Sequence, residues 1–472
     1  MGHGVSEPRV LGIDIGTSAI KAGCITPDGT LVSSSGERII GYPSQIHDWD
    51  AEAWSQTLSR LLSRLPERDQ ISAVVVSGNG PTVVAMNKAG QALQPTLLWL
   101  DPRENRVPDT ESYFLPKASW LYKHIPLLRQ KVKYFIGCPE FLSFQLTGEA
   151  VTTTPGEEFS TYIWTPEEIR AYDLNPALFP PFVQPGEFVG RVLPQAAVQF
   201  GLPERIPVFA GGSDFLMSLI GTATLQPGRT CDRAGTSEGI NYCSAEKVHD
   251  SRLRCLPHAV DGFYNIAGIL SSTGRLFEWF REISGQSNTR YDTMLEEIRA
   301  IAHTSSYPWF FPSIKHGATW EFSRGMFVEL GAEHGPAEMG RAVVESIGFA
   351  VRESMEILEE NNCPIDTVCG CGGQAKNSIW TQMKADICGK VIEVPVIQDA
   401  ELAGCAAAGF VGLGHYTSLP AAAENIVKIH ARYEPRPEEY ERYTERYNRY
   451  REVYSRFRSA ASDVLQGRSD SH

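Results

Sequence analysis

The tripeptide Gly-Thr-Ser occurs twice in this chain of 472 residues, near its beginning at 16–18 and in its second half at 235–237. Each copy follows an apolar run and precedes a second one, which predicts a strand, a tight turn and another strand. Glycine lets the main chain of such a turn approach a ligand closely, so the turn offers backbone N–H groups and hydroxyls to a phosphate. Two such turns half a chain apart indicate a duplicated fold that holds a nucleotide between its halves.

The composition indicates a globular protein and limits the kinds of partner that it can bind. Hydrophobic residues make up 42% of the chain and charged residues 21%, as in ordinary globular proteins. The net charge of −13 argues against a nucleic-acid partner, which needs a basic face. No apolar stretch approaches the roughly 20 residues of a membrane helix, and the first residues lack the apolar core of a signal peptide. We therefore expect a cytoplasmic protein without a membrane partner.

Hydrophobic patterning predicts an α/β chain with mixed sheets. In the first half it predicts β-hairpins over 9–35 and a buried strand over 71–78, with helices packed on the sheet. In the second half it predicts helices at 335–361, 377–389 and 399–412.

The strand–turn–strand pattern starts again between Thr224 and Gly228, just before the second tripeptide. We therefore expect an N-terminal domain at 1–224 and a C-terminal domain at 225–472. No low-complexity linker separates them, so the two halves are expected to touch closely.

Charged residues surround the first tripeptide. Asp14 precedes it by two residues and can hold Mg²⁺ through water, whereas like charges prevent a carboxylate from holding a phosphate. Lys21 follows it and can supply positive charge to a phosphoryl group in transfer. A plain hairpin with an aspartate at its turn explains the same residues.

Two further motifs are candidates for the site. Asp214 follows a buried strand and precedes an apolar helical run, so it is a candidate catalytic base, although a helix N-cap explains the residue type equally well. Gly372 and Gly373 form a double-glycine turn between a strand and a helix, which suits a flat ring lying against the backbone. Asn377 can then hydrogen-bond the ring or a ribose, but a lone double-glycine turn is weak evidence.

Taken together and in this order, the motifs resemble the FGGY family of carbohydrate kinases, which belong to the actin-like ATPase superfamily. The resemblance runs from Arg9 to Tyr433. It implies two ribonuclease-H-like domains, each a mixed sheet flanked by helices, with a cleft between them. The segments that carry it are Asp14 with 16–18 and Lys21, Trp49-Asp50 with Trp54, 97–101, 116–120, 235–237, Gly325 with 341–345, and Gly372-Gly373 with Asn377.

The resemblance implies an ATP-dependent sugar kinase that uses Mg²⁺. Asp214 would be the base that takes the proton from the sugar hydroxyl, and Asp14 would position Mg²⁺ at the phosphates. The residues implied at the nucleotide are Gly16, Thr17, Ser18, Lys21, Gly235, Thr236, Ser237, Gly274, Glu278, Gly372, Gly373 and Asn377, and those implied at the sugar are Asn79, Gly80, Pro81, Asp101, Asp214 and Phe215.

The chain departs from the family on the sugar side. Xylulokinase-like members carry Gln-Met-His-Gly after the strand that is predicted to end at Gly78, where this chain has Asn79, Gly80 and Pro81. Phe215 stands beside the base, where many relatives have a polar residue. These departures do not support xylulose in particular as the acceptor. The resemblance implies a ketose or polyol, with a pentulose such as xylulose first and glycerol, erythritol, another pentitol or a deoxyketose as alternatives.

Two other classes of protein compete with a kinase. One is a catalytically inactive sugar or nucleotide sensor on the same fold, and the other is an actin-like ATPase that drives a partner protein. The presence of Asp14, Lys21, Asp214 and Thr236 argues against loss of catalysis. A homodimer is implied by the resemblance alone.

Overall fold

A computed structural model describes residues 7–41, 49–66, 68–301, 307–313, 322 and 325–466. The chain forms two compact units, and each of them contains more than one stretch of the chain. The first unit consists of Met1–Leu225, Pro257–Gly262 and Asp399–Lys428, and the second of Gln226–Leu256, Phe263–Gln398 and Ile429–His472. A division into domains at 1–224 and 225–472 stays a prediction.

The first unit is built on a six-stranded mixed sheet in the order β10-β11-β4-β1-β2-β3. β1 pairs with β2 in antiparallel fashion, whereas β1–β4 and β4–β11 are parallel. The carboxyl ends of β1, β4 and β11 therefore meet at one edge of the sheet. The strands are β1 (Arg9–Ile15), β2 (Ala19–Ile25), β3 (Leu31–Arg38), β4 (Ile71–Gly78), β10 (Phe188–Arg191) and β11 (Pro207–Ser213).

Helices cover both faces of this sheet. Leu11 and Ile13 of β1 share a core with α1, α4 and α7, while Gly12 between them faces α13. A Cβ at Gly221 of α8 would lie 1.8 Å from the carbonyl oxygen of Ala400 in α13, so only glycine allows these two helices to pack so closely. The helices are α1 (Glu52–Ser63), α4 (Cys138–Thr147), α7 (Pro194–Phe200), α8 (Asp214–Gly221), α13 (Ala400–Gly412) and α14 (Leu419–Ile426).

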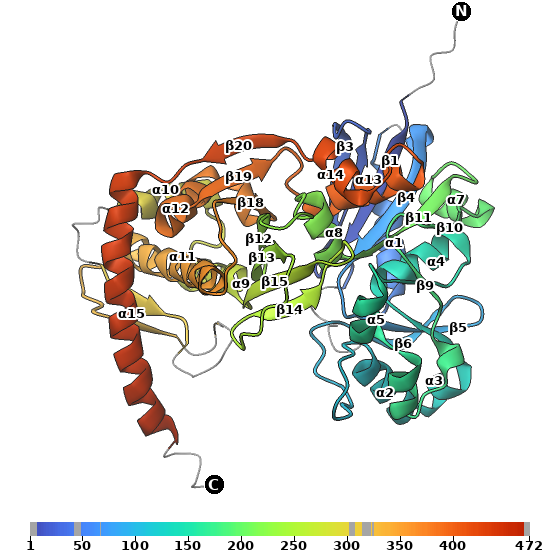
Figure 1. The fold of residues 1–472 in the computed structure, drawn as a ribbon, viewed down its shortest axis with the longest axis horizontal. Coiled ribbons are helices and arrows are strands. Elements are labelled where there is room, and N and C mark those ends of the chain that lie inside the picture. Colours follow the sequence, from blue (N-terminus) through green and yellow to red (C-terminus); the bar gives the residue numbers. More distant parts are fainter. Residues whose placement is uncertain are drawn as a thin grey trace, which may run out of the picture. The chain divides into compact units, whose positions relative to one another are not determined.

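Figure 1 shows that α13 and α14, which are red, lie beside the blue strands of the first unit, although hundreds of residues separate them in sequence. A smaller three-stranded sheet in the order β6-β5-β7 belongs to the same unit. Its elements and their neighbours are β5 (Val83–Asn87), β6 (Ala92–Leu97), β7 (Val132–Ile136), α2 (Leu115–His124), α3 (Pro126–Lys131), α5 (Glu157–Ile163), α6 (Pro166–Ala171) and the pair β8 (Thr152–Thr153) and β9 (Phe182–Val183).

The second unit is built on a seven-stranded mixed sheet in the order β14-β15-β13-β12-β18-β19-β20. β12 pairs with β13 in antiparallel fashion and with β18 in parallel fashion, which repeats the arrangement of β2, β1 and β4. The strands are β12 (Thr230–Ala234), β13 (Glu238–Ser244), β14 (Arg254–Pro257), β15 (Tyr264–Leu270), β18 (Thr367–Cys371), β19 (Val391–Pro395) and β20 (Ile429–Tyr433).

The long helix α11 is tied to the C-terminal helix α15 by a buried ionic network. Arg341 donates to Glu345 on the same helix at 2.7 Å and to the hydroxyl of Tyr443 on α15 at 2.7 Å. Figure 1 shows α15 in red running past α11. The remaining elements are α9 (Thr273–Ile283), α10 (Tyr291–Ala300), β16 (Trp309–Phe311), β17 (Met326–Val328), α11 (Pro336–Glu360), α12 (Ser378–Cys388) and α15 (Pro437–Gln466).

The predicted α/β class, with mixed sheets flanked by helices, is confirmed. The helices expected at 335–361, 377–389 and 399–412 are confirmed, each within one residue at either end. Within the part of the chain that the structure describes, no helix combines the length and the apolar character needed to cross a membrane.

Candidate functional site

Both tripeptides lie at the turn of an antiparallel hairpin, as predicted. The N–H of Gly16 donates to the carbonyl of Ala19 at 3.0 Å between β1 and β2. The N–H of Gly235 donates to the carbonyl of Ser237 at 2.9 Å between β12 and β13. Ser18 in the first turn and Thr236 in the second are exposed, so both turns present a hydroxyl to solvent.

Asp14 lies inside β1, opposite Lys21 in β2, so it is not the turn residue that a plain hairpin would need. Its carboxylate is buried and accepts a hydrogen bond from Ser77 at 3.1 Å. Lys21 forms an ion pair with Asp399 at 2.6 Å. Burial lowers the pKa of Lys21, but Asp399, Asp14 and Glu401 outweigh it and raise this pKa above its ordinary value. The lysine therefore remains a cation beside the first turn.

Asp214 is the first residue of α8, and the helix does not use it as an N-cap. The cap is Ser213, whose hydroxyl accepts a hydrogen bond from the N–H of Leu216 at 3.3 Å. The N-cap explanation of Asp214 is therefore wrong. Its half-buried carboxylate accepts the N–H of Phe215 at 2.7 Å.

The sheet brings Asp14 and Asp214 into one neighbourhood, because β1, β4 and β11 end at the same edge. Cys138, at the start of α4, lies within the electrostatic reach of both carboxylates. Burial, and then the charges of Glu140, Asp14 and Asp214, hold the pKa of its thiol well above the ordinary value. Cys138 therefore stays protonated and does not act as a nucleophile.

Asn79, a predicted sugar residue, is committed to the first turn. Its amide N–H group donates to the carbonyls of Ile15 at 3.0 Å and Gly16 at 3.2 Å. Its amide oxygen accepts from the hydroxyl of Thr82 at 2.6 Å, and the side chain is only 3% exposed. Asn79 therefore connects the end of β4 to the first turn through the hydrogen bonds of its side chain.

Gly80 and Pro81 follow at the surface beside the candidate base. A Cβ at Gly80 would lie 3.6 Å from the Cβ of Ser213 and 3.9 Å from the ring of Phe114. Gly80, Pro81, Asp214 and Phe215 are all half-buried, and they present one carboxylate among mainly apolar groups.

Asp101, also predicted at the sugar, is buried and paired with Arg103. The guanidinium donates through Nε at 3.0 Å and through Nη2 at 2.7 Å to the two carboxylate oxygens. Lys117 donates to the backbone carbonyl of Asp101 at 2.5 Å. The carboxylate therefore fixes Arg103, which is the more exposed member of the pair.

Sequence reasoning missed Trp99, although its motif carried part of the resemblance. The indole N–H of Trp99 donates to the hydroxyl of Thr17 at 3.1 Å. It also missed Asp399 and Glu401, which surround Lys21. The only feature of the sequence that could have pointed to Asp399 and Glu401 was their position at the start of the predicted helix 399–412.

In the second unit, the start of α9 packs directly on the second turn. A Cβ at Gly274 would lie 2.1 Å from the carbonyl oxygen of Gly235 and 3.2 Å from the Cα of Thr236. The N–H of Arg275 donates to the carbonyl of Thr236 at 3.3 Å. Gly274 is therefore a close-approach glycine that sets the position of the second turn.

Gly274→Ala is expected to lower the free energy of unfolding by about 1–3 kcal/mol, because the new methyl group must displace the backbone of Gly235. The measurement is chemical denaturation of the variant and the parent. Gly36→Ala is the matched control, since Gly36 is exposed in β3 and its Cβ would meet nothing nearer than the carbonyl oxygen of Ile20 at 3.8 Å. Equal stability of the two variants would contradict the close approach.

The double-glycine turn joins the same cluster. Gly372 has φ of +85°, and a Cβ there would lie 2.5 Å from the carbonyl oxygen of Ala234, so β18 can leave the sheet only through glycine. Gln374 donates to the hydroxyl of Thr273 at 3.2 Å and accepts from the indole of Trp380 at 2.6 Å. Gly373 is exposed, with open space where a side chain would be.

Two other predicted nucleotide residues have protein partners. Asn377 caps α12 by accepting from the N–H of Trp380 at 2.9 Å, and its amide donates to Asp292 at 2.6 Å. Glu278 is exposed, one turn after Gly274 on α9, and pairs with Arg281 at 3.0 Å. The double-glycine turn, the start of α9 and the second turn thus form one surface of the second unit.

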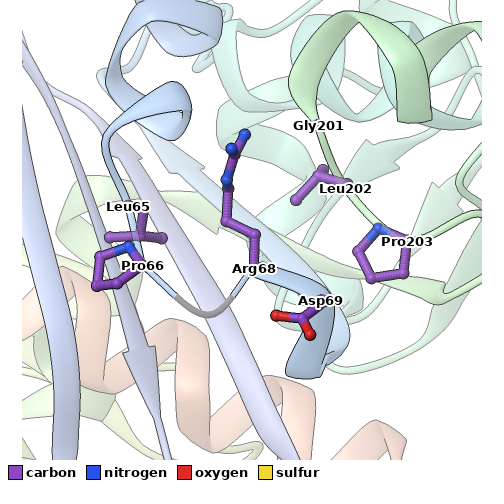
Figure 2. A pocket seen from close by; sticks show the side chains of 7 residues that line it. All are labelled: Leu65, Pro66, Arg68, Asp69, Gly201, Leu202 and Pro203. Carbon is purple, nitrogen blue, oxygen red and sulfur yellow. The ribbon is translucent and has the colours of Figure 1, made fainter.

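A hollow of about 570 Å³ lies elsewhere on the first unit (Figure 2). Arg68 and Asp69, which line it, come immediately before β4 begins. The hollow is therefore at the amino end of β4, whereas Asp14 and Asp214 gather at the carboxyl ends of the strands. It contains none of the predicted site residues.

The sequence matches both domains of one protein family. Residues 9–110 and 105–221 match the N-terminal domain of the FGGY family of carbohydrate kinases, and residues 233–413 match its C-terminal domain. A xylulose kinase from Bacillus subtilis is 27% identical over 468 residues, which cover 90% of this chain and 93% of that protein.

Solved structures share the fold. The ligand-bound xylulose kinase from Lactobacillus acidophilus has a TM-score of 0.79 at 20% identity, covering 97% of this chain and 100% of that one. A gluconate kinase from the same organism has a TM-score of 0.80 at 19% identity, with the same coverage. The fold is therefore shared by kinases named for different sugars.

Proposed function

Because this chain belongs to the FGGY family of carbohydrate kinases and phosphorylates a sugar with ATP, we propose that Asp214 removes the proton from the acceptor hydroxyl. The observation that carries this proposal is the position of Asp214 at the carboxyl edge of the sheet, near Asp14, with the capping of α8 left to Ser213. Because Ser213 caps α8, the Asp214 carboxylate has no capping role, which supports its proposed role as the base.

The base supplies only part of the rate enhancement. A general base contributes a factor of roughly 10² to 10⁴. The transition state of phosphoryl transfer is loose, so alignment and charge neutralisation contribute the larger share. Lys21, held as a cation by Asp399, provides positive charge next to the first turn.

We assign the phosphates of ATP to the two turns and the adenosine to the second unit. Ser18 and Thr236 are exposed, and Thr17 and Ser237 are partly exposed, which supports the binding of phosphate by hydroxyls of both turns. Gly274, Gly372 and Gly373 are the proposed contacts for the adenine and ribose. Gly373 is exposed with open space beside it, whereas Gly274 and Gly372 pack closely against the backbone of Gly235 and Ala234. Asn377 supports this surface by capping α12.

Mg²⁺ fits the residues near the first turn. Asp14, Asp399 and Glu401 offer the hard carboxylate oxygens that Mg²⁺ prefers. Among the described residues, no three His, Cys, Asp or Glu side chains are grouped so that they could hold a metal ion by themselves. Asp14 would hold Mg²⁺ through water, and the ion would neutralise charge on the phosphates.

A ketopentose such as xylulose is the proposed acceptor. The match to a xylulose kinase over most of both chains supports it. Gly80, Pro81 and Phe215 present little polarity beside Asp214, which favours a deoxyketose as the second candidate. A cytoplasmic location, where ATP is supplied, and a homodimer are also proposals.

The test is release of ADP from Mg-ATP across a panel of ketopentoses, pentitols, glycerol, erythritol, deoxyketoses and gluconate. We expect one ketose to stimulate turnover far above the rate without sugar, with a phosphorylated sugar as the second product. If ADP were released at the same rate with each sugar as without sugar, the protein would be an ATPase. If it bound ATP but released no ADP, it would be a sensor.

A further inference from the structure

Trp99, in the segment after β6, determines which hydrogen bonds the hydroxyl of Thr17 can make. The indole Nε1–H donates to the Oγ of Thr17 at 3.1 Å. An indole N–H can only donate, so the Thr17 oxygen must accept. The single hydrogen of the Thr17 hydroxyl is then directed to a different acceptor.

Trp99 is itself fixed by a chain of hydrogen bonds that all run in one direction. Its backbone N–H donates to the Oγ of Thr82 at 3.1 Å, and Thr82 donates to the amide oxygen of Asn79 at 2.6 Å. Asn79 donates in turn to the carbonyls of Ile15 and Gly16 at the first turn. Thr82 is completely buried and Asn79 almost so, which strengthens each bond and its neighbours.

Trp99 is therefore connected to the first turn in two ways, directly through Thr17 and indirectly through Thr82 and Asn79. The indirect connection passes close to the proposed base. The segment that the Asn79–Thr82 bond spans contains Gly80, which packs against Ser213. Ser213 immediately precedes Asp214. These hydrogen bonds therefore connect the first turn to the segment that lies beside Ser213 and Asp214.

We propose that Trp99 is a positioning residue that orients the Thr17 hydroxyl to donate its hydrogen to a phosphate oxygen of ATP. The proposal rests on the phosphate-binding role proposed for Thr17. Trp99 acts through Thr17, because the described contact of its indole N–H is with the threonine oxygen. Phenylalanine at position 99 would keep the aromatic ring but leave the hydroxyl free to rotate.

The experiment is a double-mutant cycle of Trp99→Phe and Thr17→Val, read by calorimetric binding of a non-hydrolysable Mg-ATP analogue. Trp99→Phe is expected to raise Kd about threefold to tenfold, as expected for the loss of one hydrogen bond. In the Thr17→Val background the same substitution is expected to change Kd by less than twofold. Thr17→Ser retains the hydroxyl and should preserve the effect of Trp99→Phe.

Trp49→Phe is the matched control, because the indole N–H of Trp49 is buried and has no hydrogen-bond partner among the described residues. It is expected to leave Kd unchanged even where it lowers the thermal midpoint. An equal effect of Trp99→Phe with and without the Thr17 hydroxyl, or an unchanged Kd, would overturn the proposal. Nucleotide binding is measured without a sugar, so the two tests are independent. If no sugar of the panel were phosphorylated but the double-mutant cycle gave the expected result, the proposed function would be overturned and this inference would stand.

Discussion

Asp214→Asn is expected to lower kcat by about 10²- to 10⁴-fold, because asparagine cannot accept the proton of the acceptor hydroxyl. The substitution keeps the size and shape of the side chain. It also leaves the start of α8 intact, since Ser213 provides the cap. The affinity for Mg-ATP is therefore expected to stay unchanged. The measurements are steady-state kinetics with the best sugar of the panel and calorimetric binding of the nucleotide.

Ser213→Ala separates catalysis from helix capping. It removes the cap and is expected to lower the free energy of unfolding by about 1 kcal/mol, while the Asp214 carboxylate is retained. Its kcat should therefore fall far less than that of Asp214→Asn. If Asp214→Asn instead lost nucleotide binding and thermal stability together, its role would be structural and the base would have to be sought elsewhere.

The local parts of the fold could be predicted from the sequence because their signals are local. Both hairpins follow from apolar runs on either side of a glycine turn, and the strand predicted at 71–78 is β4 itself. The helix at 399–412 was also predicted from its own pattern. Its packing partners were not, because small residues that permit close packing do not say which helices or strands lie opposite. A Cβ at Gly404 would lie 2.0 Å from the carbonyl oxygen of Met217, a contact between residues far apart in sequence.

The sequence predicts which residues belong to the candidate site. Only the structure shows which of their polar atoms already form hydrogen bonds within the protein. Asp101 and Asn79 belong to recognisable motifs, yet Arg103 and the first turn satisfy their side chains. Trp99 stands in an apolar run, where tryptophan is expected in the core, so its hydrogen bond to Thr17 had no sequence signal. Bonds of this kind depend on distances between separate strands and loops.

A buried ionic cluster beside the second turn leads to the second large effect. Lys384 on α12 pairs with Asp232 of β12 at 2.7 Å and contacts Glu238, the first residue of β13. All three side chains are at most 4% exposed. One cation therefore balances two buried carboxylates that stand on either side of the turn at 235–237.

Lys384→Met is expected to lower the free energy of unfolding by about 3–5 kcal/mol, because it leaves two buried carboxylates without their cation. The measurement is chemical denaturation at pH 8. Lys390→Met is the matched control, since Lys390 pairs with Glu359 nearer the surface and should cost about 0–1 kcal/mol. Similar losses in the two variants would contradict the importance of burial.

The same cluster makes stability depend on pH through Asp232. Burial first, and then the charge of Glu238, outweigh Lys384 and raise the pKa of Asp232 from 3.8 to about 7. Between these values the folded state keeps a proton that the unfolded state has released. The contribution of Asp232 to stability is therefore present in full below pH 4 and falls by up to about 1.4 kcal/mol per pH unit as the pH rises toward 7. Asp232→Asn does not titrate, so its stability relative to the parent should increase from pH 5 to 7 and level off above 7. A constant difference across that range would show that Asp232 is already ionised in the folded protein.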